Sequence, residues 1–435
     1  MGIGLLKSGR VAWRNVLDKG LVMGIRVLFP LLLGWVAILL TACETGEQRH
    51  AASMATPGVS DAEVRIGSSL ALTGHASFLG IQTLRGAQCY LNHVNDTGGI
   101  HGRRIKLIAL DDGYDPTICV ANTQQLLVDE NVFALFCYVG TPTTVKIIPL
   151  VERAKVPLIG MFTGANALRE PFNPYIINVR ASYYQETGVV VKHLVEDMGL
   201  KKIAVFYQYD AYGLDGLRGA ELGLKKYNLA PVAKSSYTRG TLDVEEGLEK
   251  VLESDAQAVI MIGTYEPCAK FIRLAKNRRS HLIFYNVSFV GVEELARLLG
   301  QDGEDVIVSQ VVPPPELPEA RDMLKDVDRY VERLRQYFPD EKPNSVSLEG
   351  YFNALVLGEG LKRAGQDLTR EGFIKAIESI RDYPLGKDAI LSFGDQDHQG
   401  MDRVYFTIIK SGKLVLLTDW KDLSRRYGHA PPATP

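Results

Sequence analysis

The chain has 435 residues, of which 46% are hydrophobic and 23% are charged, the balance of a globular protein rather than of a disordered or fibrous one. Its formal net charge is −2, and a surface without a positive excess argues against nucleic acid or an anionic membrane surface as a partner. The eight histidines are scattered and no cysteines show the C-x-x-C spacing of zinc sites, so we predict neither a metal nor another cofactor.

The N-terminal segment has the pattern of a secretory signal peptide. Arg26 precedes an apolar run of 14 residues, Val27 to Leu40, and small residues follow. The run is too short to span a bilayer, which takes about 20 apolar residues; the alternative is a buried hydrophobic helix. We expect residues 1–42 to be removed, whether translation starts at Met1 or at Met23. Removal lowers the number of basic residues from 49 to 44 and the number of acidic residues from 51 to 50, which gives a net charge near −6.

The sequence Leu40-Thr41-Ala42-Cys43 resembles the lipobox of bacterial lipoproteins. The resemblance implies that Cys43 becomes the N-terminus and carries acyl chains, which together anchor a protein stably. Glu44 after the cysteine favours the outer membrane. The polar residues 43–61 then form a flexible tether, so we expect the folded part to lie in the periplasm, attached to the membrane only through the lipid.

From Glu63 onward, apolar strand patterns alternate with helical patterns, which is typical of α/β proteins with parallel sheets. The predicted strands cover residues 64–70, 104–110, 132–138, 157–161, 175–179, 202–207, 257–262, 281–285 and 306–311. The helices predicted between them cover residues 80–96, 117–130, 143–154, 184–198, 214–227, 243–254, 267–277 and 292–300. This spacing fits two successive doubly wound units.

The pattern changes after Pro313-Pro314-Pro315. Helices are predicted near 319–337, 347–364 and 370–379, and strands near 389–393, 402–410 and 413–418. We assign the polar end, 423–435, to a disordered tail.

The loops between these elements carry landmarks in a fixed order. They are Ala71–Gly74, Asn95 before the turn Gly98–Gly102, Asp111–Pro116, Gly140–Thr143, Phe162–Ala165 and Tyr209–Gly213. Their order and spacing resemble the branched-chain amino acid (Leu/Ile/Val-type) periplasmic binding proteins, the receptor components of ABC importers, over about residues 62–420. The resemblance implies a binding protein rather than an enzyme, with the type I periplasmic binding fold.

That fold consists of two Rossmann-like lobes joined by three chain crossings, here expected near 178–181, 310–314 and 385–390. Lobe one then comprises 62–180 and 313–386, and lobe two comprises 181–312 and 387–422. The resemblance further implies that a small ligand binds between the lobes, which close like a hinge and dock on ABC permease subunits. The expected position agrees with the rule that ligands bind beyond the carboxyl ends of parallel strands. We expect a monomer.

The resemblance places the ligand's carboxylate at small loop residues of lobe one, where backbone N–H groups at a helix N-terminus favour anions. The matching residues are Gly140, Thr141, Thr143, Phe162, Thr163 and Gly164. Pro142 and Thr143 also suit the start and cap of a helix, which is the alternative.

Aromatic side chains, which combine apolar area with a polar group, complete the predicted pocket. The matching positions are an apolar wall at Phe78 and Leu79, Tyr183 just past the first crossing, and Tyr212, Tyr265 and Glu266 of lobe two. Because the chain has 19 tyrosines, partial surface burial is the alternative for each.

One position departs from the family pattern. Amino-acid-binding members place an acidic residue, which meets the ligand's ammonium group, at the position that aligns with Ser288. A buried ammonium group without a charged partner is costly. Either Glu266 takes that role, or the ligand lacks an α-amino group and is a carboxylate or amide.

Four cysteines, Cys89, Cys119, Cys137 and Cys268, remain in the processed chain. Family members can carry a disulfide in the first lobe, at positions that match about Tyr114 and Val139. The resemblance therefore suggests a bridge between the nearby Cys119 and Cys137. Cys268 is expected to be a buried thiol.

Three other functions compete with transport. A nucleotide-dependent enzyme is disfavoured because no G-x-G-x-x-G fingerprint, G-x-S-x-G or Walker A motif appears. A sensory receptor would use the same two lobes without feeding a permease. A carrier of a larger hydrophobic solute would use the apolar side chains predicted around the cleft.

Overall fold

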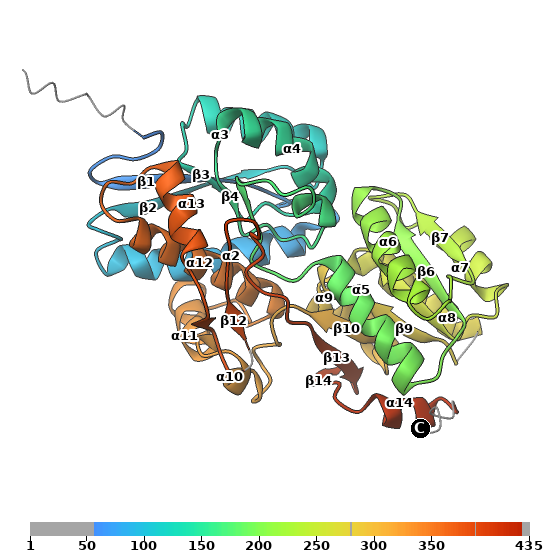
Figure 1. The fold of residues 1–435 in the computed structure, drawn as a ribbon. Coiled ribbons are helices and arrows are strands. Elements are labelled where there is room, and N and C mark those ends of the chain that lie inside the picture. Colours follow the sequence, from blue (N-terminus) through green and yellow to red (C-terminus); the bar gives the residue numbers. More distant parts are fainter. Residues whose placement is uncertain (1–55, 279–280, 388, 429–435) are drawn as a thin grey trace, which may run out of the picture. The chain divides into compact units, whose positions relative to one another are not determined.

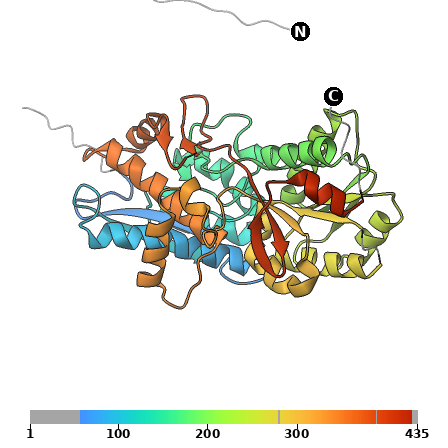
Figure 2. The same cartoon turned by 90° about the horizontal axis from the view of Figure 1, so that it is seen from below.

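A computed structural model describes residues 56–278, 281–387 and 389–428. The predicted signal peptide, Cys43 and most of the tether lie outside the described residues. Figures 1 and 2 show the described elements as two sheets with helices on their faces. Within this part of the chain, no helix combines the length and hydrophobicity that a membrane span requires.

The first sheet contains five parallel strands in the order β2-β1-β3-β4-β5. The strands are β1 (Glu63–Leu70), β2 (Arg104–Asp111), β3 (Ala134–Phe136), β4 (Leu158–Ile159) and β5 (Ile176–Ile177). Helices α3 (Pro116–Val128) and α4 (Thr141–Ala154) contribute to the core on one face, with Leu135. Ala134 and Phe136 belong to the core of the opposite face, because successive strand side chains point to opposite sides.

That opposite face is covered by α2 (Ser77–Asp96) and by the later helices α10 (Ala320–Met323), α11 (Val327–Tyr337), α12 (Ser345–Ala364) and α13 (Arg370–Glu378). Glycines let α2 and α12 approach closely. A Cβ on Gly86 would lie 1.7 Å from the Ser347 carbonyl oxygen, and one on Gly350 would lie 2.2 Å from that of Thr83. Helices from distant parts of the sequence therefore form one layer of lobe one.

The second sheet has seven strands in the order β14-β13-β10-β9-β8-β6-β7. They are β6 (Ile203–Gln208), β7 (Lys234–Tyr237), β8 (Ala258–Ile262), β9 (Ile283–Asn286), β10 (Ile307–Gln310), β13 (Tyr405–Lys410) and β14 (Lys413–Leu416), the last two antiparallel. Its α-helices are α5 (Tyr183–Lys192), α6 (Ala211–Lys225), α7 (Glu245–Leu252), α8 (Tyr265–Arg278), α9 (Val292–Leu299) and α14 (Trp420–Arg426). The expected alternation of strands and helices is confirmed, except that the polar edge strand β7 was not predicted.

The chain passes between the sheets after β5, after β10 and before β13. The segment predicted as the third crossing, 385–390, instead contributes to the β-hairpin of β11 (Tyr383–Pro384) and β12 (Ile390–Leu391). Side chains up to Met401 belong to a core of lobe one, and the Gly400 N–H donates to the Asn178 carbonyl at 2.8 Å. The first and third crossings therefore run side by side, and the third lies later than predicted.

Two predicted boundaries are wrong. Gly58, assigned to the tether, is buried against the first sheet, where its Cβ would lie 2.2 Å from the Phe133 nitrogen. Residues 423–426, assigned to the tail, complete α14, whose Leu423 is fully buried. Both segments contribute apolar contacts that a composition-based boundary does not register.

The predicted disulfide between Cys119 and Cys137 is also wrong. All four described cysteines are buried free thiols. Cys119 belongs to the core on the α3 side of the first sheet and Cys137 to the core on the α2 side, so the sheet separates them. Cys268 is the buried thiol that the sequence predicted.

Candidate ligand-binding site

Five aromatic side chains meet where loops after the strands of both sheets face each other. We call them the aromatic cluster: Tyr114 and Phe162 from lobe one, and Tyr183, Tyr212 and Phe289 from lobe two, each at most 1% exposed. The ring of Phe289 is central, with centroids 4.7 Å from Tyr212, 5.6 Å from Phe162 and 6.0 Å from Tyr114. The cluster lies at the position where open α/β sheets bind ligands.

Gly140 makes room for Tyr114. It has φ 97° and ψ 148°, a backbone conformation almost restricted to glycine. A Cβ at this position would lie 2.0 Å from Cε2 of Tyr114. Tyr114 itself has a positive φ of 65°, which turns the chain after β2. The glycine is thus required both by the backbone and by the ring against it.

The predicted carboxylate cradle surrounds the N-terminus of α4. The hydroxyl groups of Thr141 and Thr163 are hydrogen-bonded to each other at 2.7 Å. The Thr143 hydroxyl donates to the Val139 carbonyl oxygen at 2.6 Å and to that of Gly140 at 2.9 Å, so it bonds back onto the preceding turn. The alternative is confirmed for Pro142, which lies at the start of α4, but Thr143 is not a cap: the N-cap is Gly140, without a side-chain cap bond.

Tyr183 and Tyr212 are placed by the starts of two helices. Ser182 forms a capping box with Gln185 at the start of α5, and Asp210 accepts a 3.0 Å hydrogen bond from the Tyr212 N–H at the start of α6. A Cβ on Gly164 would lie 2.7 Å from the Tyr183 ring, which explains the glycine there. The two tyrosine ring centroids are 5.3 Å apart.

Some polar atoms of this region lack hydrogen-bond partners of normal geometry among the described residues. They are the hydroxyl groups of Tyr114 and Tyr183, Nε2 of His75 and Nε of Arg180. Burial raises the pKa of both tyrosine hydroxyl groups well above the usual value, so they stay protonated. Unpaired buried polar groups are rare in native proteins and call for an explanation.

Hydrogen bonds also join the lobes outside the aromatic cluster. Backbone N–H groups donate from Phe78 to the Tyr265 hydroxyl (3.4 Å), from Asn166 to Asp215 (3.1 Å) and from Ser345 to Glu293 (2.6 Å). Leu79 lies beside Gly291 of lobe two. Phe78 and Glu293 also line a groove of about 850 Å³ that residues of both lobes enclose.

Glu266 is exposed on the first turn of α8 and is not part of the aromatic cluster. Ser288, by contrast, is buried and bonded to a charged network. Its N–H and hydroxyl group donate to the Glu186 carboxylate at 2.9 and 3.0 Å, and its hydroxyl accepts a bond from Arg180.

Arg180 lies between two buried carboxylates. Its guanidinium is 3.1 Å from Glu186 of α5 and 3.2 Å from Glu349 of α12, with side-chain exposures of 1%, 0% and 5%. The guanidinium carbon also lies 5.3 Å from the Phe162 ring centroid and 5.7 Å from that of Tyr183. Burial raises the pKa of Glu349 to about 7, although Arg180 acts against that rise. The network links the first crossing to both lobes.

Sequence reasoning missed four residues of this site: Tyr114, Arg180, Glu186 and Glu349. Phe289 is one of the apolar side chains predicted around the cleft for a larger hydrophobic solute, and Tyr114 had a signal because it lies inside the landmark Asp111–Pro116. The three charged residues belong to no motif. Glu186 shares the buried face of α5 with Tyr183 and Val190, but helical spacing does not show which cation a buried carboxylate meets.

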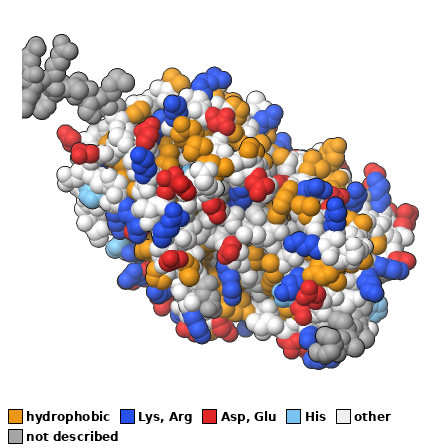
Figure 3. Space-filling view, viewed as in Figure 1, with side chains coloured by type: hydrophobic (Ala, Val, Ile, Leu, Met, Phe, Trp, Pro, Cys, Tyr) orange, Lys and Arg blue, Asp and Glu red, His pale blue; other side chains and the backbone are white. Residues whose placement is uncertain are grey.

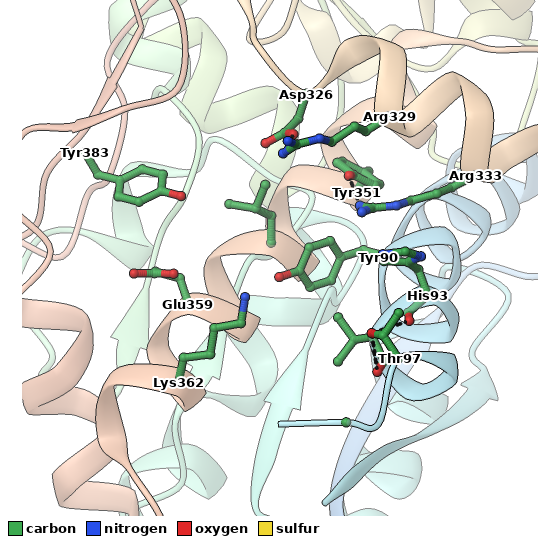
Figure 4. Close-up of a pocket in the computed structure, with 13 residues that line it drawn as sticks. Tyr90, His93, Thr97, Asp326, Arg329, Arg333, Tyr351, Glu359, Lys362 and Tyr383 are labelled. Carbon is green, nitrogen blue, oxygen red and sulfur yellow. Dashed lines mark hydrogen bonds and ion pairs between the residues drawn. The ribbon is translucent and has the colours of Figure 1, made fainter. Parts of the chain in front are cut away.

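A smaller hollow of about 240 Å³ lies in lobe one, between α2, α11 and α12 (Figure 4). The Arg333 guanidinium covers the rings of Tyr351 and Tyr90 at 5.5 and 5.8 Å, and Asp326 pairs with Arg329 at 2.8 Å. This hollow shares no residue with the aromatic cluster, so it is a separate feature of lobe one.

Two Rossmann-like lobes around a shared buried site define a type I periplasmic binding protein. The family model described as "Periplasmic binding protein" matches residues 63–413, and the chain belongs to that family. Its members are periplasmic substrate-binding proteins rather than enzymes; they bind small ligands and work with ABC permeases.

The chain is similar to a possible leucine/isoleucine/valine-binding protein from Rhodopirellula baltica, with 34% identity, 85% of this chain and 99% of that chain covered, and a TM-score of 0.78. It is also similar to a substrate-binding periplasmic protein from Ralstonia solanacearum, with 28% identity, coverages of 82% and 100%, and a TM-score of 0.75. Among curated relatives, Leu/Ile/Val-binding protein homolog 7 of Brucella suis is 24% identical over 362 residues, 80% of this chain and 89% of the relative.

Proposed function

We propose that the chain is a lipid-anchored solute-binding protein that captures a small amphipathic ligand, an amino acid, amide or carboxylate, between its lobes and delivers it to an ABC importer. The observation that carries this proposal is the aromatic cluster, which combines buried apolar rings from both lobes with hydroxyl groups that lack partners. Such a mixture of apolar lining and a few polar groups is typical of small-molecule sites.

Ligand capture proceeds by closure of the lobes. The open protein presents one half-site on each lobe, and a ligand that contacts both halves shifts the population toward the closed form. The closed form then docks on the permease. The close ring contacts across the lobes, such as Phe162 to Phe289 at 5.6 Å, favour a small solute over the larger hydrophobic one.

The anchor and the location follow from the first residues of the processed chain. Cys43 carries the acyl chains, and Glu44 directs the protein to the outer membrane. Acidic and basic side chains are interspersed over the face in Figure 3, which fits a monomer in water that uses neither nucleic acid nor a membrane surface as a partner. Replacement of Cys43 by alanine is expected to abolish labelling of the protein by a fatty acid in cells.

Thermal unfolding of the purified protein against a panel of amino acids, amides and carboxylates tests the binding function. A ligand at 100 times its Kd stabilises the folded state by about 2.7 kcal/mol, which raises the Tm by several degrees. Phe289→Ala is expected to remove the ligand-dependent rise. The matched control is Phe271→Ala, which truncates an equally buried phenylalanine beside Phe206. Both variants unfold at lower temperature, but only the control keeps the response to ligand. Absence of any response in the unmodified protein would refute the proposal.

Delivery is tested separately from binding. Loss of uptake of the identified ligand in cells that lack this gene supports transport. Unchanged uptake with intact binding would instead favour a ligand-sensing receptor.

A further inference from the structure

We propose that the site between the lobes selects a carboxylate with an apolar body and no ammonium group. This inference rests on the proposed binding function and names the substrate class within it. It follows from the state of each carboxylate near the aromatic cluster and from the donors that have no partner.

Glu186 is the carboxylate nearest to Ser288, and its oxygen atoms are fully used. One oxygen accepts from Arg180 at 3.1 Å and from the Ser288 hydroxyl at 3.0 Å. The other accepts from the Ser288 N–H at 2.9 Å and from the Ser309 hydroxyl. A carboxylate offers about four acceptor positions, so Glu186 has none left for an ammonium group.

The other nearby carboxylates are also engaged. Both oxygens of Glu349 contact Arg180, at 3.2 and 3.4 Å. Asp210 accepts from two N–H groups at the start of α6 and from the Gln208 side chain at 2.7 Å. Glu266 is exposed on α8. None of these carboxylates is therefore free to pair with an ammonium group. Glu293, whose Oε2 has no partner among the described residues, lies instead in the groove with Phe78.

Ser288 is an unfavourable place for an ammonium group for a second reason. Its hydroxyl accepts a hydrogen bond from the Arg180 guanidinium. An ammonium group at this hydroxyl would compete with Arg180 for the lone pairs of the oxygen, and the hydroxyl hydrogen is already donated to Glu186.

Groups that can stabilise an anion, in contrast, remain available. The Tyr114 and Tyr183 hydroxyl groups and the Arg180 Nε–H are buried donors without partners of normal geometry. The N-terminus of α4, with the Thr141 and Thr163 hydroxyl groups beside it, adds the end of a 14-residue helix that favours anions. These donors match a carboxylate, and the rings match an apolar body.

Calorimetric titration of the purified protein at pH 7 with matched pairs tests the inference. The pairs are 4-methylpentanoate with leucine and 3-phenylpropanoate with phenylalanine. We expect at least one acid to bind 100-fold or more tightly than its amino acid. Equal or tighter binding of the amino acids would overturn the inference and leave the binding function intact. Binding of neither set would contradict the inference, and silence across the wider amphipathic panel would contradict the proposed function as well.

A pair of conservative variants locates the donors. Tyr183→Phe removes a hydroxyl group without a partner of normal geometry, so the fold should keep its stability while the acid binds about tenfold more weakly. The matched control is Tyr138→Phe, because the Tyr138 hydroxyl is equally buried but is 2.9 Å from Thr123 within lobe one. It should leave acid affinity unchanged. Equal affinities of Tyr183→Phe and the unmodified protein would remove Tyr183 from the site.

Discussion

Replacement of Gly140 by alanine tests the central packing contact of the site. The new methyl group would occupy a position 2.0 Å from Cε2 of Tyr114, which is buried to 1% exposure and cannot swing into solvent. Overpacking of this kind destabilises by about 1–3 kcal/mol. The backbone at φ 97° and ψ 148° adds about 1–3 kcal/mol of strain for any residue but glycine. We therefore expect a loss of about 2–6 kcal/mol.

A second glycine separates the two contributions. Gly365 has a similar backbone, with φ 80° and ψ −166°, but a Cβ there would meet nothing within 4 Å. Gly365→Ala should therefore show only the strain, about 1–3 kcal/mol. The steric part of the Gly140 effect should disappear when Tyr114 is first replaced by alanine, so the two changes should couple by about 1–3 kcal/mol.

Urea unfolding followed by circular dichroism measures these differences, provided that the slope of each transition stays constant. The reasoning is refuted if Gly140→Ala destabilises no more than Gly365→Ala, or if its effect is the same with and without the Tyr114 ring. Ligand affinity gives an independent readout, because a displaced Tyr114 ring disturbs the aromatic cluster, whereas Gly365 lies at the end of α12.

Three further predictions concern charge, pH and thiols. Arg180→Met leaves Glu186 without its buried cation, so it should lower the free energy of unfolding in urea by about 3–5 kcal/mol. The control Arg297→Met, at a side chain that is 67% exposed, should change stability by less than about 1 kcal/mol. Equal effects of the two variants would contradict the buried network. Burial raises the pKa of Asp215 to about 6, above its ordinary value of 3.8, so the folded protein holds this proton more tightly than the unfolded protein does. The resulting stabilisation of the folded state is complete below pH 4 and is lost as the pH rises through 6. Relative to Asp215→Asn, the unmodified protein should lose on the order of 1 kcal/mol of stability between pH 4 and 7. If the two proteins show parallel curves of stability against pH, Asp215 makes no such contribution. Finally, the four buried cysteines are free, so the denatured, unreduced processed protein should take up iodoacetamide at all four, and prior reduction should add no label.

Local patterns were sufficient for most of the elements and for their order, but not for the polar edge strand β7. The strand β1 and the helix after it, for example, were predicted from an apolar run followed by amphipathic spacing, and glycine-rich turns marked their ends. The order of landmarks also led to the type I periplasmic binding fold. Predictions failed where burial depends on a distant partner: Gly58 packs against Phe133, and the third crossing packs beside Asn178.

Some residues of the candidate site could likewise be predicted from the sequence, and others could not. The family resemblance indicated Phe162, Tyr183 and Tyr212, in agreement with the rule that ligands bind beyond the carboxyl ends of parallel strands. It could not indicate what surrounds Ser288. Arg180, Glu186 and Glu349 are separated by up to 169 residues in sequence and meet only because α5 and α12 approach the first crossing from different lobes.

The sequence by itself thus determined the alternation of strands and helices, the landmarks of the fold and the aromatic character of the site. These properties depend on neighbours a few residues apart, through side-chain periodicity and backbone preference. Only the tertiary structure decided which charges are paired, which hydroxyl groups are left without partners and which cysteines a sheet keeps apart. Those properties depend on how lobes and sheet faces pack, because hydrogen bonding and desolvation act over a few ångströms in space whatever the distance along the chain.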